Sequence, residues 1–352
     1  MSTVPPVGAL PERMDAAVLK GPGALEVEEV DVPTMGDDDV LVAVDLCGVC
    51  GSDLHMVLEG WGRPGSWEGH EWVGQITAVG AGVDRWQVGD LVVGGPTTRC
   101  GECPMCIAGR PSLCAERDTP GIGPEQGAFA TYKVAPGRDL LAMPDGLESR
   151  AAALAEPLAV ALHGIHQAKI QAGQTAMVFG AGPIGALTIA ALRTMGVDDV
   201  TCVEPHERRQ QLAADVGATR VLTPGDLTVP SIAEPGLILP EAVDVVLECS
   251  GHRSAMEAGL AQLKRGGILV LVGAGIDPPR FDPNRILLNE LVVTGSFTYD
   301  LGGFDEALAL LASGQLPVDH LLEPEVVPLD GLLEAMRGLV DGRLAGKVLV
   351  KP

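Results

Sequence analysis

The sequence predicts an α/β protein with two domains: an all-β domain of barrel type and a doubly wound domain built on a parallel sheet. Residues 1 to about 155 contain short alternating runs separated by Gly- and Pro-rich turns. Residues from about 157 to 300 alternate apolar strands with helical patterns. The chain of 352 residues is long enough for two buried cores. We expect residues 1–156 and 301–352 to form the first domain and residues 157–300 the second.

The first domain should contain strands at 40–46, 72–79 and 91–93. Between the first two lies a set of side chains that suits a metal. Cys50 offers a thiolate, His70 an imidazole nitrogen and Glu71 a carboxylate, all common zinc ligands. Three protein ligands leave one position open, which makes a zinc site catalytic because the metal stabilises the anion of a bound alcohol. Ser52 and His55 follow the thiolate closely enough to carry the released proton to solvent.

Cys47 and Cys50 also form a CxxC pair, which is typical of redox pairs. We predict that Cys50 alone is a ligand, because the strand at 40–46 places Cys47 at its end and Cys50 in the loop beyond.

A second group of cysteines lies at 96–116. Four thiolates this close in sequence predict a closed, tetrahedral and therefore structural zinc site. A disulfide pair or an iron–sulfur cluster is the alternative, although the late fourth cysteine and the lack of a following Pro favour zinc. The metal would replace the core that this apolar-poor segment lacks. The ligands expected are Cys100, Cys103, Cys106 and Cys114.

The second domain opens with a dinucleotide-binding fingerprint. An apolar strand at 175–179 is followed by a glycine turn, a helix to about residue 195 ended by Gly196, and a strand at 200–203 that ends at Glu204. The glycines let the backbone approach a pyrophosphate, and the helix N-terminus receives its charge. The residues of this turn are Gly180, Gly182, Pro183, Ile184 and Gly185.

Glu204 favours NAD as the cofactor. Its carboxylate can accept the ribose hydroxyls and repels a 2′-phosphate. Arg208 and Arg209 follow closely and could pair with such a phosphate, so NADP remains the alternative, and Arg209 is expected to contact the cofactor in either case.

Further strands are expected at 243–247, 268–272 and 291–294. Ser250, Gly273 and Ser296 follow them, at the carboxyl ends where a doubly wound sheet binds its ligand. The four prolines at 222–242 indicate an irregular crossover. Helices at 305–311 and 332–340 and a strand at 348–351 should return to the first domain.

The composition limits the class of protein. The net charge of −23, from 24 Lys and Arg against 47 Asp and Glu, repels nucleic acid and anionic membranes. The sequence has no long apolar run, its start lacks the features of a secretion signal, and its cysteines suit a reducing compartment. A cytoplasmic location is expected.

Over essentially its whole length the sequence resembles the zinc-containing medium-chain alcohol dehydrogenase family. The motifs that carry the resemblance are GVCGSDLH at 48–55, GHE at 69–71, the four-cysteine segment, Glu156-Pro157 and GAGPIG at 180–185. Glu156 stands where a second cysteine ligand would be, as in the polyol, butanediol and threonine dehydrogenase branch. The resemblance implies a GroES-like catalytic domain, a Rossmann domain, two zinc ions per chain, and a homodimer or homotetramer joined near residues 291–294.

Glu156 raises an electrostatic question. Zinc with anionic Cys50 and Glu71 and neutral His70 sums to zero, and ionised Glu156 would make the site negative, which opposes formation of another anion. We therefore expect Glu156 to be a mobile carboxylate that ligates zinc in some states and bonds to its water in others.

The expected reaction is hydride transfer between an alcohol and NAD. Sorbitol-type enzymes have a Tyr and an Arg at the places of Met56 and Thr298, so the sequence favours a secondary alcohol, a diol or a sugar-type alcohol. Trp61, Trp67, Met56 and Leu58 would line an apolar pocket if their loop folds over the zinc. The alternatives are a family member that binds zinc and NAD without activity, an NADP-preferring carbonyl reductase, and a zinc-free quinone or enone reductase.

Overall fold

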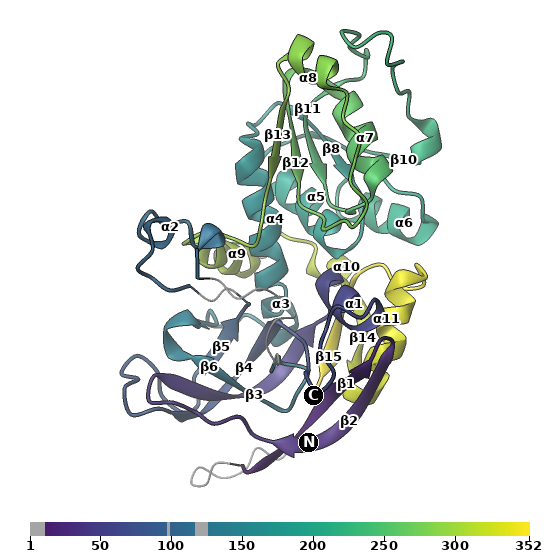
Figure 1. The fold of residues 1–352 in the computed structure, drawn as a ribbon. Helices are drawn as coiled ribbons and strands as arrows, with labels where there is room; N and C mark the ends of the chain where they lie inside the picture. The colour runs from purple at the N-terminus through teal and green to yellow at the C-terminus, as the bar shows by residue number, and fades with distance from the viewer. Residues whose placement is uncertain (1–10, 97–98, 117–125) are drawn as a thin grey trace.

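The computed structural model describes residues 11–96, 99–116 and 126–352 and shows two halves, each built around a sheet (Figure 1). The predictions that concern residues 1–10, and residues 97 and 98 of the cysteine segment, lie outside the described residues.

The upper half in Figure 1 is a six-stranded parallel sheet. Its strand order is β10-β9-β8-β11-β12-β13, a doubly wound order as predicted. Its helices are α5 (Pro183–Thr194), α6 (Glu207–Asp215), α7 (Arg253–Ala261) and α8 (Pro283–Asn289). The strands are β8 (Thr175–Phe179), β9 (Asp199–Val203), β10 (Arg220–Leu222), β11 (Val243–Glu248), β12 (Leu263–Leu271) and β13 (Val292–Gly295).

Most of these strands begin and end within a residue of the expected positions. β12 begins five residues before the expected start at 268, because Leu263 already pairs with Val243 before an irregularity in the register. The segment 222–242 contains a short 3₁₀ turn at Pro224–Asp226 and is otherwise irregular, which confirms the predicted crossover.

The lower half contains a seven-stranded sheet with the path β14-β15-β3-β4-β5-β7 and with β6 paired to β3. A separate hairpin lies beside it (Figure 1). The strands of the sheet are β3 (Asp39–Gly48), β4 (Glu71–Val79), β5 (Leu91–Gly94), β6 (Tyr132–Pro136), β7 (Leu141–Ala142), β14 (Leu322–Pro328) and β15 (Lys347–Lys351). The hairpin strands are β1 (Arg13–Gly21) and β2 (Ala24–Asp31).

The C-terminal segment returns to the lower half as expected, because β15 pairs with β3. The predicted helices in this segment are also present, as α9 (Gly303–Ala312) and α11 (Leu332–Val340), with the short α10 (Val318–Leu321) between them.

The expectation that residues 1–155 are all β is wrong, because this part of the chain also contains α1 (Gly51–Leu58), α2 (Pro104–Ile107) and α3 (Ser149–Ala152). A longer helix, α4 (Ala155–Ala168), follows directly. It is buried on almost every side, so it shows no apolar stripe of helical period in the sequence.

α4 connects the two halves. Leu158 and Leu162 on α4 belong to one buried cluster that also includes Val73 of the seven-stranded sheet and Leu247 of the parallel sheet. A continuous apolar core of this kind fixes the two sheets relative to each other.

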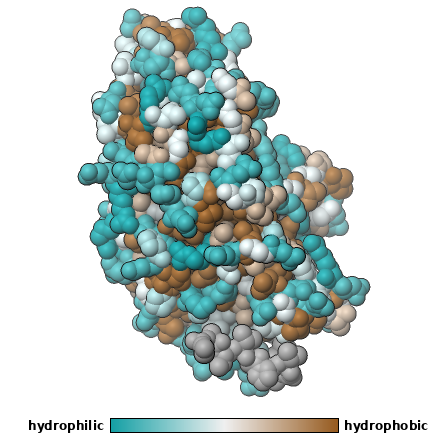
Figure 2. Space-filling view, turned by 180° about the vertical axis from the view of Figure 1, so that it is seen from behind, coloured by the Kyte–Doolittle hydropathy of each residue, from teal (hydrophilic) through white to brown (hydrophobic). Residues whose placement is uncertain are grey.

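The surface is largely hydrophilic, with apolar groups gathered at mid-height in the view from behind (Figure 2). Within the described residues, no helix is long and apolar enough to span a bilayer.

Candidate active site

Three of the predicted metal ligands meet in space. The ligand atoms of Cys50, His70 and Glu71 all lie within 4.8 Å of one another. Cys50 is the N-cap of α1, His70 precedes β4, and Glu71 is the first residue of that strand. A thiolate, an imidazole and a carboxylate at this separation fit a single zinc ion.

Two glycines allow this approach of backbone and side chains. Gly69 has φ +99°, and a Cβ on it would lie 2.7 Å from the backbone nitrogen of Phe129. A Cβ on Gly48 would lie 2.3 Å from Oε2 of Glu71. Larger residues at either position would displace a ligand, which explains the glycine on each side of the cluster.

Asp53 supports the histidine of this cluster, and the sequence analysis did not assign it a role. Its carboxylate accepts a hydrogen bond from the backbone N–H of Cys50 at 2.8 Å, and its Oδ1 lies 3.6 Å from Nδ1 of His70. A carboxylate beside one ring nitrogen orients the ring and makes the other nitrogen a better ligand. The sequence contained a signal, because Cys50 and Asp53 have the spacing of a capping box.

Lys347 is a second contributor that the sequence analysis missed. This residue is 1% exposed, and its ammonium donates to Oε1 and Oε2 of Glu71 at 2.7 and 2.6 Å and to the carbonyl of Val49 at 2.9 Å. Burial alone would lower the pKa of Lys347, but the negative charges of Glu71, Cys50 and Glu156 together raise it, so the side chain stays charged. The only hint in the sequence is a lysine at the start of an apolar strand.

Glu156 lies in the first turn of α4 and is 4% exposed. It is not part of the three-residue set, although it interacts electrostatically with His70 and Glu71. Burial raises the pKa of Glu156 to about 8, and the negative charge of Glu71 acts in the same direction. In the metal-free site, Glu156 is therefore a carboxyl group that readily holds a proton.

The two residues expected to move a proton lie on α1. Ser52 is exposed in its first turn, and His55 lies three residues later, which places both on one side of the helix. Nδ1 of His55 lies 2.8 Å from Oε2 of Glu59, and the ring stacks on Trp61 with 4.9 Å between centroids. Trp61 therefore borders the His55 side chain.

The other apolar residues expected at a pocket behave differently. Trp67 is 6% exposed and packs in the buried cluster that contains Met14, and Met56 is 6% exposed. Leu58 packs against a second buried cluster. These side chains belong to the core.

Cys47 is completely buried at the end of β3, and its thiol lies 3.6 Å from the carbonyl of Gly48. It is not among the clustered ligand atoms, whereas Cys50 is. This arrangement agrees with the prediction that Cys50 alone faces the metal.

The four cysteines of the 96–116 segment also meet within 4.8 Å of one another. The Sγ atom of Cys100 lies 3.6 Å from that of Cys114 and 4.0 Å from that of Cys106. A tetrahedral zinc ion with bonds of about 2.3 Å separates its sulfur atoms by about 3.8 Å, so the set fits one ion. All four thiols are free rather than paired in disulfides.

Backbone N–H groups stabilise the thiolates of this segment. The N–H of Cys103 donates to Sγ of Cys100 at 3.3 Å, and that of Cys106 donates to Sγ of Cys103 at 3.4 Å. The second bond is the main reason that the pKa of Cys103 falls to about 6, whereas burial raises the pKa of Cys106 to about 12. Thiolates near neutral pH are the form that binds zinc.

The glycine turn has the geometry that a dinucleotide needs. Gly180 has φ +86°, and a Cβ on Gly185 would lie 1.8 Å from the carbonyl oxygen of Gly180. Gly182, the N-cap of α5, has open space where its Cβ would be, and Pro183 begins the helix, with Ile184 following. The backbone at the positive end of α5 is thus accessible to a pyrophosphate.

Glu204 is held more tightly than the sequence suggested. It is 2% exposed, and its carboxylate accepts hydrogen bonds from the backbone N–H groups of Ala181 at 2.8 Å and His206 at 3.0 Å. Arg208 donates to Glu323 at 2.8 Å, and Arg209 donates to the carbonyl of Leu339 at 2.6 Å. Both arginines expected near a 2′-phosphate are therefore engaged elsewhere.

The other predicted cofactor residues lie at the carboxyl edge of the parallel sheet. The Cβ of Ser250 lies 2.8 Å from the position that a Cβ on Gly180 would take, and a Cβ on Gly273 would lie 2.2 Å from the nitrogen of Gly251. The hydroxyl of Ser296 is buried and makes no hydrogen bond to any described residue. A buried donor without a partner suits a site that a ligand completes.

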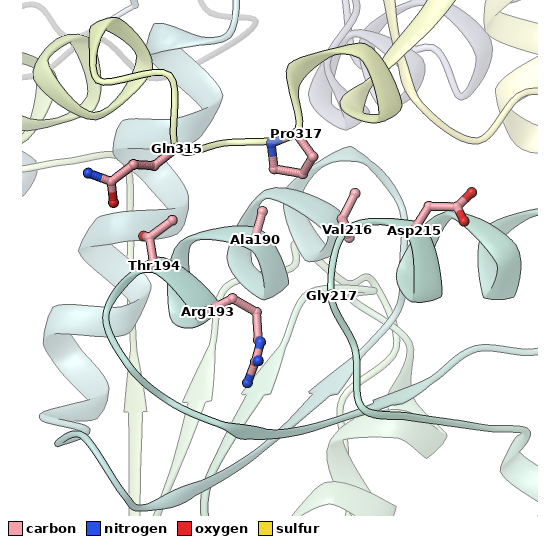
Figure 3. A pocket seen from close by; sticks show the side chains of 8 residues that line it. All are labelled: Ala190, Arg193, Thr194, Asp215, Val216, Gly217, Gln315 and Pro317. Carbon is pink, nitrogen blue, oxygen red and sulfur yellow. The ribbon is translucent and has the colours of Figure 1, made fainter.

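A shallow hollow of about 520 Å³ lies elsewhere, between α5, the end of α6 and the segment before α10 (Figure 3). None of the residues discussed above lines it. Its lining residues are Ala190, Arg193, Thr194, Asp215, Val216, Gly217, Gln315 and Pro317.

Comparisons with known proteins agree with this geometry. The family described as alcohol dehydrogenase GroES-like domain matches residues 36–145, and the family described as zinc-binding dehydrogenase matches residues 183–313. The sorbitol dehydrogenase of Bacillus subtilis (strain 168) is 32% identical over 359 aligned positions, which cover 97% of this chain and 98% of that protein.

Two crystal structures are similar along the whole chain. That of 2R,3R-butanediol dehydrogenase from Bacillus subtilis has a TM-score of 0.84 and 31% identity, covering 96% of this chain and 99% of the other. That of a zinc-binding dehydrogenase from Sinorhizobium meliloti 1021 bound to NADP has a TM-score of 0.84 and 32% identity, covering 97% and 99%.

Proposed function

Because the chain belongs to the zinc-containing medium-chain alcohol dehydrogenase family, in its polyol dehydrogenase branch, we propose that Cys50, His70 and Glu71 hold the catalytic zinc of an alcohol-oxidising enzyme. The observation that supports this proposal most directly is the approach of the three ligand atoms to within 4.8 Å of one another. Zinc bound there supplies Lewis-acid stabilisation to the oxygen of an alcohol as it loses its proton. Cys100, Cys103, Cys106 and Cys114 would hold a second, structural zinc.

The residues around the ligands have separate tasks in this proposal. Ser52 receives the proton of the alcohol and passes it towards His55 and solvent. Glu156 sits beside the ligands as a carboxyl group that gains or loses a proton or enters the coordination shell. The glycine turn and Ser296 hold the dinucleotide so that the hydride-accepting carbon of its nicotinamide faces the alcohol.

NAD is the proposed cofactor. Its support is the carboxylate of Glu204 at the end of β9, which disfavours a 2′-phosphate, and the engagement of Arg208 and Arg209 with other groups. NADP is the second candidate, because a similar structure binds it and because Nε of Arg209 is buried without a hydrogen-bond partner among the described residues.

The proposed substrates are secondary alcohols, diols and sugar-type alcohols. Relatives named sorbitol dehydrogenase and butanediol dehydrogenase support this range. Thr298, in place of an Arg, offers fewer hydrogen-bond donors to a substrate with many hydroxyls, which favours the smaller diols and secondary alcohols.

We propose the domain bounds expected from the sequence, with residues 301–352 completing the catalytic domain. We also propose that the protein is a homodimer or homotetramer joined through β13. Its proposed location is the reducing cytoplasm.

The test is a panel of simple secondary alcohols, vicinal diols and hexitols, each assayed with NAD⁺ and with NADP⁺ at the nicotinamide absorbance, with and without a chelator. We expect turnover with NAD⁺ that the chelator abolishes. Turnover that survives complete metal removal would instead identify a zinc-free reductase, and an inactive protein with two bound zinc ions would identify a binding protein.

The Cys50→Ser and Cys47→Ser variants make a matched pair, because the two thiols lie three residues apart. C50S should lose activity and one of two zinc ions measured by elemental analysis. C47S should keep both ions. Loss of zinc from C47S but not from C50S would show that Cys47, rather than Cys50, is the ligand.

A further inference from the structure

Asp300 connects the four-cysteine segment to the turn that follows β13. Its Oδ2 accepts from Nε of Arg110 at 3.1 Å, and its Oδ1 accepts from the hydroxyl of Ser112 at 2.6 Å and from the backbone N–H of Ser112 at 3.3 Å. The backbone N–H of Leu301 donates to the carbonyl of Gly109 at 3.1 Å. All three partners lie between Cys106 and Cys114, so the contacts bind this turn to the zinc segment itself.

The other neighbours of Asp300 lead to the catalytic cluster. Nε2 of His163 on α4 lies 4.0 Å from Oδ2 of Asp300, and Glu156 lies two turns earlier on the same helix. Tyr299, which precedes Asp300, is 6% exposed. A Cβ on Gly95 would lie 2.2 Å from the Tyr299 hydroxyl oxygen and 3.0 Å from Cγ of Glu156, so the two side chains flank the same point.

The turn is also strained. Thr298 has φ +45°, a conformation that is rare for a β-branched residue. Its hydroxyl oxygen is buried and accepts or donates no hydrogen bond among the described residues. Strain of this kind persists only where the surrounding contacts enforce it. The hydrogen bonds of Asp300, two residues later, can hold the backbone of Thr298 in this conformation.

We propose that Asp300 is a positioning residue through which the four-cysteine segment holds Thr298 and Tyr299 against the catalytic cluster. The second zinc site would then support the shape of the substrate site as well as the stability of its own segment. The inference rests on the proposed function, because it concerns the fit of the alcohol beside Glu156.

A double-mutant cycle on kcat/KM tests this role, with Asp300→Asn, Tyr299→Phe and the combined variant. If Asp300 acts through Tyr299, each single variant lowers kcat/KM about tenfold and the combination is no worse than the more damaging single variant. Effects that multiply, to about a hundredfold, would show that Asp300 acts independently and would overturn the inference.

Glu306→Gln is the matched control. It removes the pairing of Glu306 with His166, 3.4 Å apart, which also joins α4 to the segment after β13 but does not involve the four-cysteine segment. E306Q should leave kcat, KM and the preference among alcohols unchanged, whereas D300N should change KM and that preference. Equal effects of both variants would reduce Asp300 to a general stabilising role.

Zinc content separates the possible failures. D300N should retain the wild-type zinc content, so its loss of kcat/KM would not arise from an empty site. If D300N does not fold, Ser112→Ala removes one of the same hydrogen bonds and should lower kcat/KM in the same direction. An inactive wild-type protein would overturn the proposed function, whereas an active wild type with independent effects would overturn this inference alone.

Discussion

Lys347 changes the charge balance that the sequence suggested for the catalytic cluster. The expected count considered zinc, Cys50, Glu71 and Glu156 and ended at a net negative charge. The ammonium of Lys347, 2.6 Å from Glu71, adds one positive charge. With it, ionised Glu156 brings the total to zero rather than below it, so charge alone no longer opposes direct ligation by Glu156.

Replacement of Lys347 should make the protein depend on its metal. In Lys347→Met, the carboxylate of Glu71 stays buried and loses the ammonium that pairs with it, so a bound zinc ion becomes its main neutralising partner. Breaking a buried pair costs about 3–5 kcal/mol, so the metal-free variant should unfold at a much lower temperature than metal-free wild type. Thermal unfolding with and without a chelator measures this difference. Lys347→Arg keeps the charge and is the control; equal chelator effects in K347M and wild type would contradict the prediction.

Glu156 should make the stability of the metal-free protein depend on pH. Its pKa rises from 4.5 to about 8 in the folded state, so the fold favours the protonated form. The contribution of Glu156 to the free energy of unfolding is therefore fully present below pH 4.5 and is lost as pH rises through about 8. The loss is at most about 1.4 kcal/mol for each pH unit.

Glu156→Gln tests this dependence, because its amide cannot ionise. The thermal midpoint of the chelated wild type should fall between about pH 5 and pH 8 by more than that of chelated E156Q. Parallel curves for the two proteins would show that Glu156 is not the group responsible.

At the level of elements, β13 is the exposed feature with the clearest consequence. It is the last strand of the parallel sheet, so one of its edges is unpaired among the residues that the structure describes, and Val292 on it is 47% exposed. Leu287 and Leu288 on the preceding α8 are 72% and 56% exposed. An apolar sheet edge of this kind commonly pairs with a second copy about a two-fold axis.

Val292→Asp should weaken this association. A charge at the centre of the joined edges would have to be buried without a partner, so sedimentation should show monomers at concentrations where the wild type is dimeric. Val340→Asp, with similar exposure at the end of α11, is the control and should leave the assembly intact. A V292D protein that remains fully dimeric would place the interface elsewhere.

The elements that the sequence predicted well are those that local pattern determines. The strands of the parallel sheet are short apolar runs bounded by glycine or polar residues. The spacing of the glycines from Gly180 to Gly185 is enough to predict a dinucleotide-binding turn. The helix α4 was missed because burial on nearly every side removes the periodic pattern that marks a surface helix.

At the scale of the whole molecule, the ligands closest in sequence were predictable and their distant supports were not. Cys50, His70 and Glu71 are recognisable because each is a strong ligand type at a short spacing. Lys347 meets Glu71, and Asp300 meets Arg110, only because of how the sheets and α4 are arranged. Nothing in the residues around a lone lysine or aspartate indicates a partner that far along the chain.

The pairing of Cys47 with Val350 has a consequence for how the protein forms during translation. The seven-stranded sheet needs strands from both ends of the described chain, whereas the six strands of the parallel sheet come from one uninterrupted stretch between them. The half that contains the parallel sheet can therefore fold on the ribosome before the other half, whose sheet is incomplete until β15 has been synthesised. Lys347, the partner of Glu71, is the first residue of that strand.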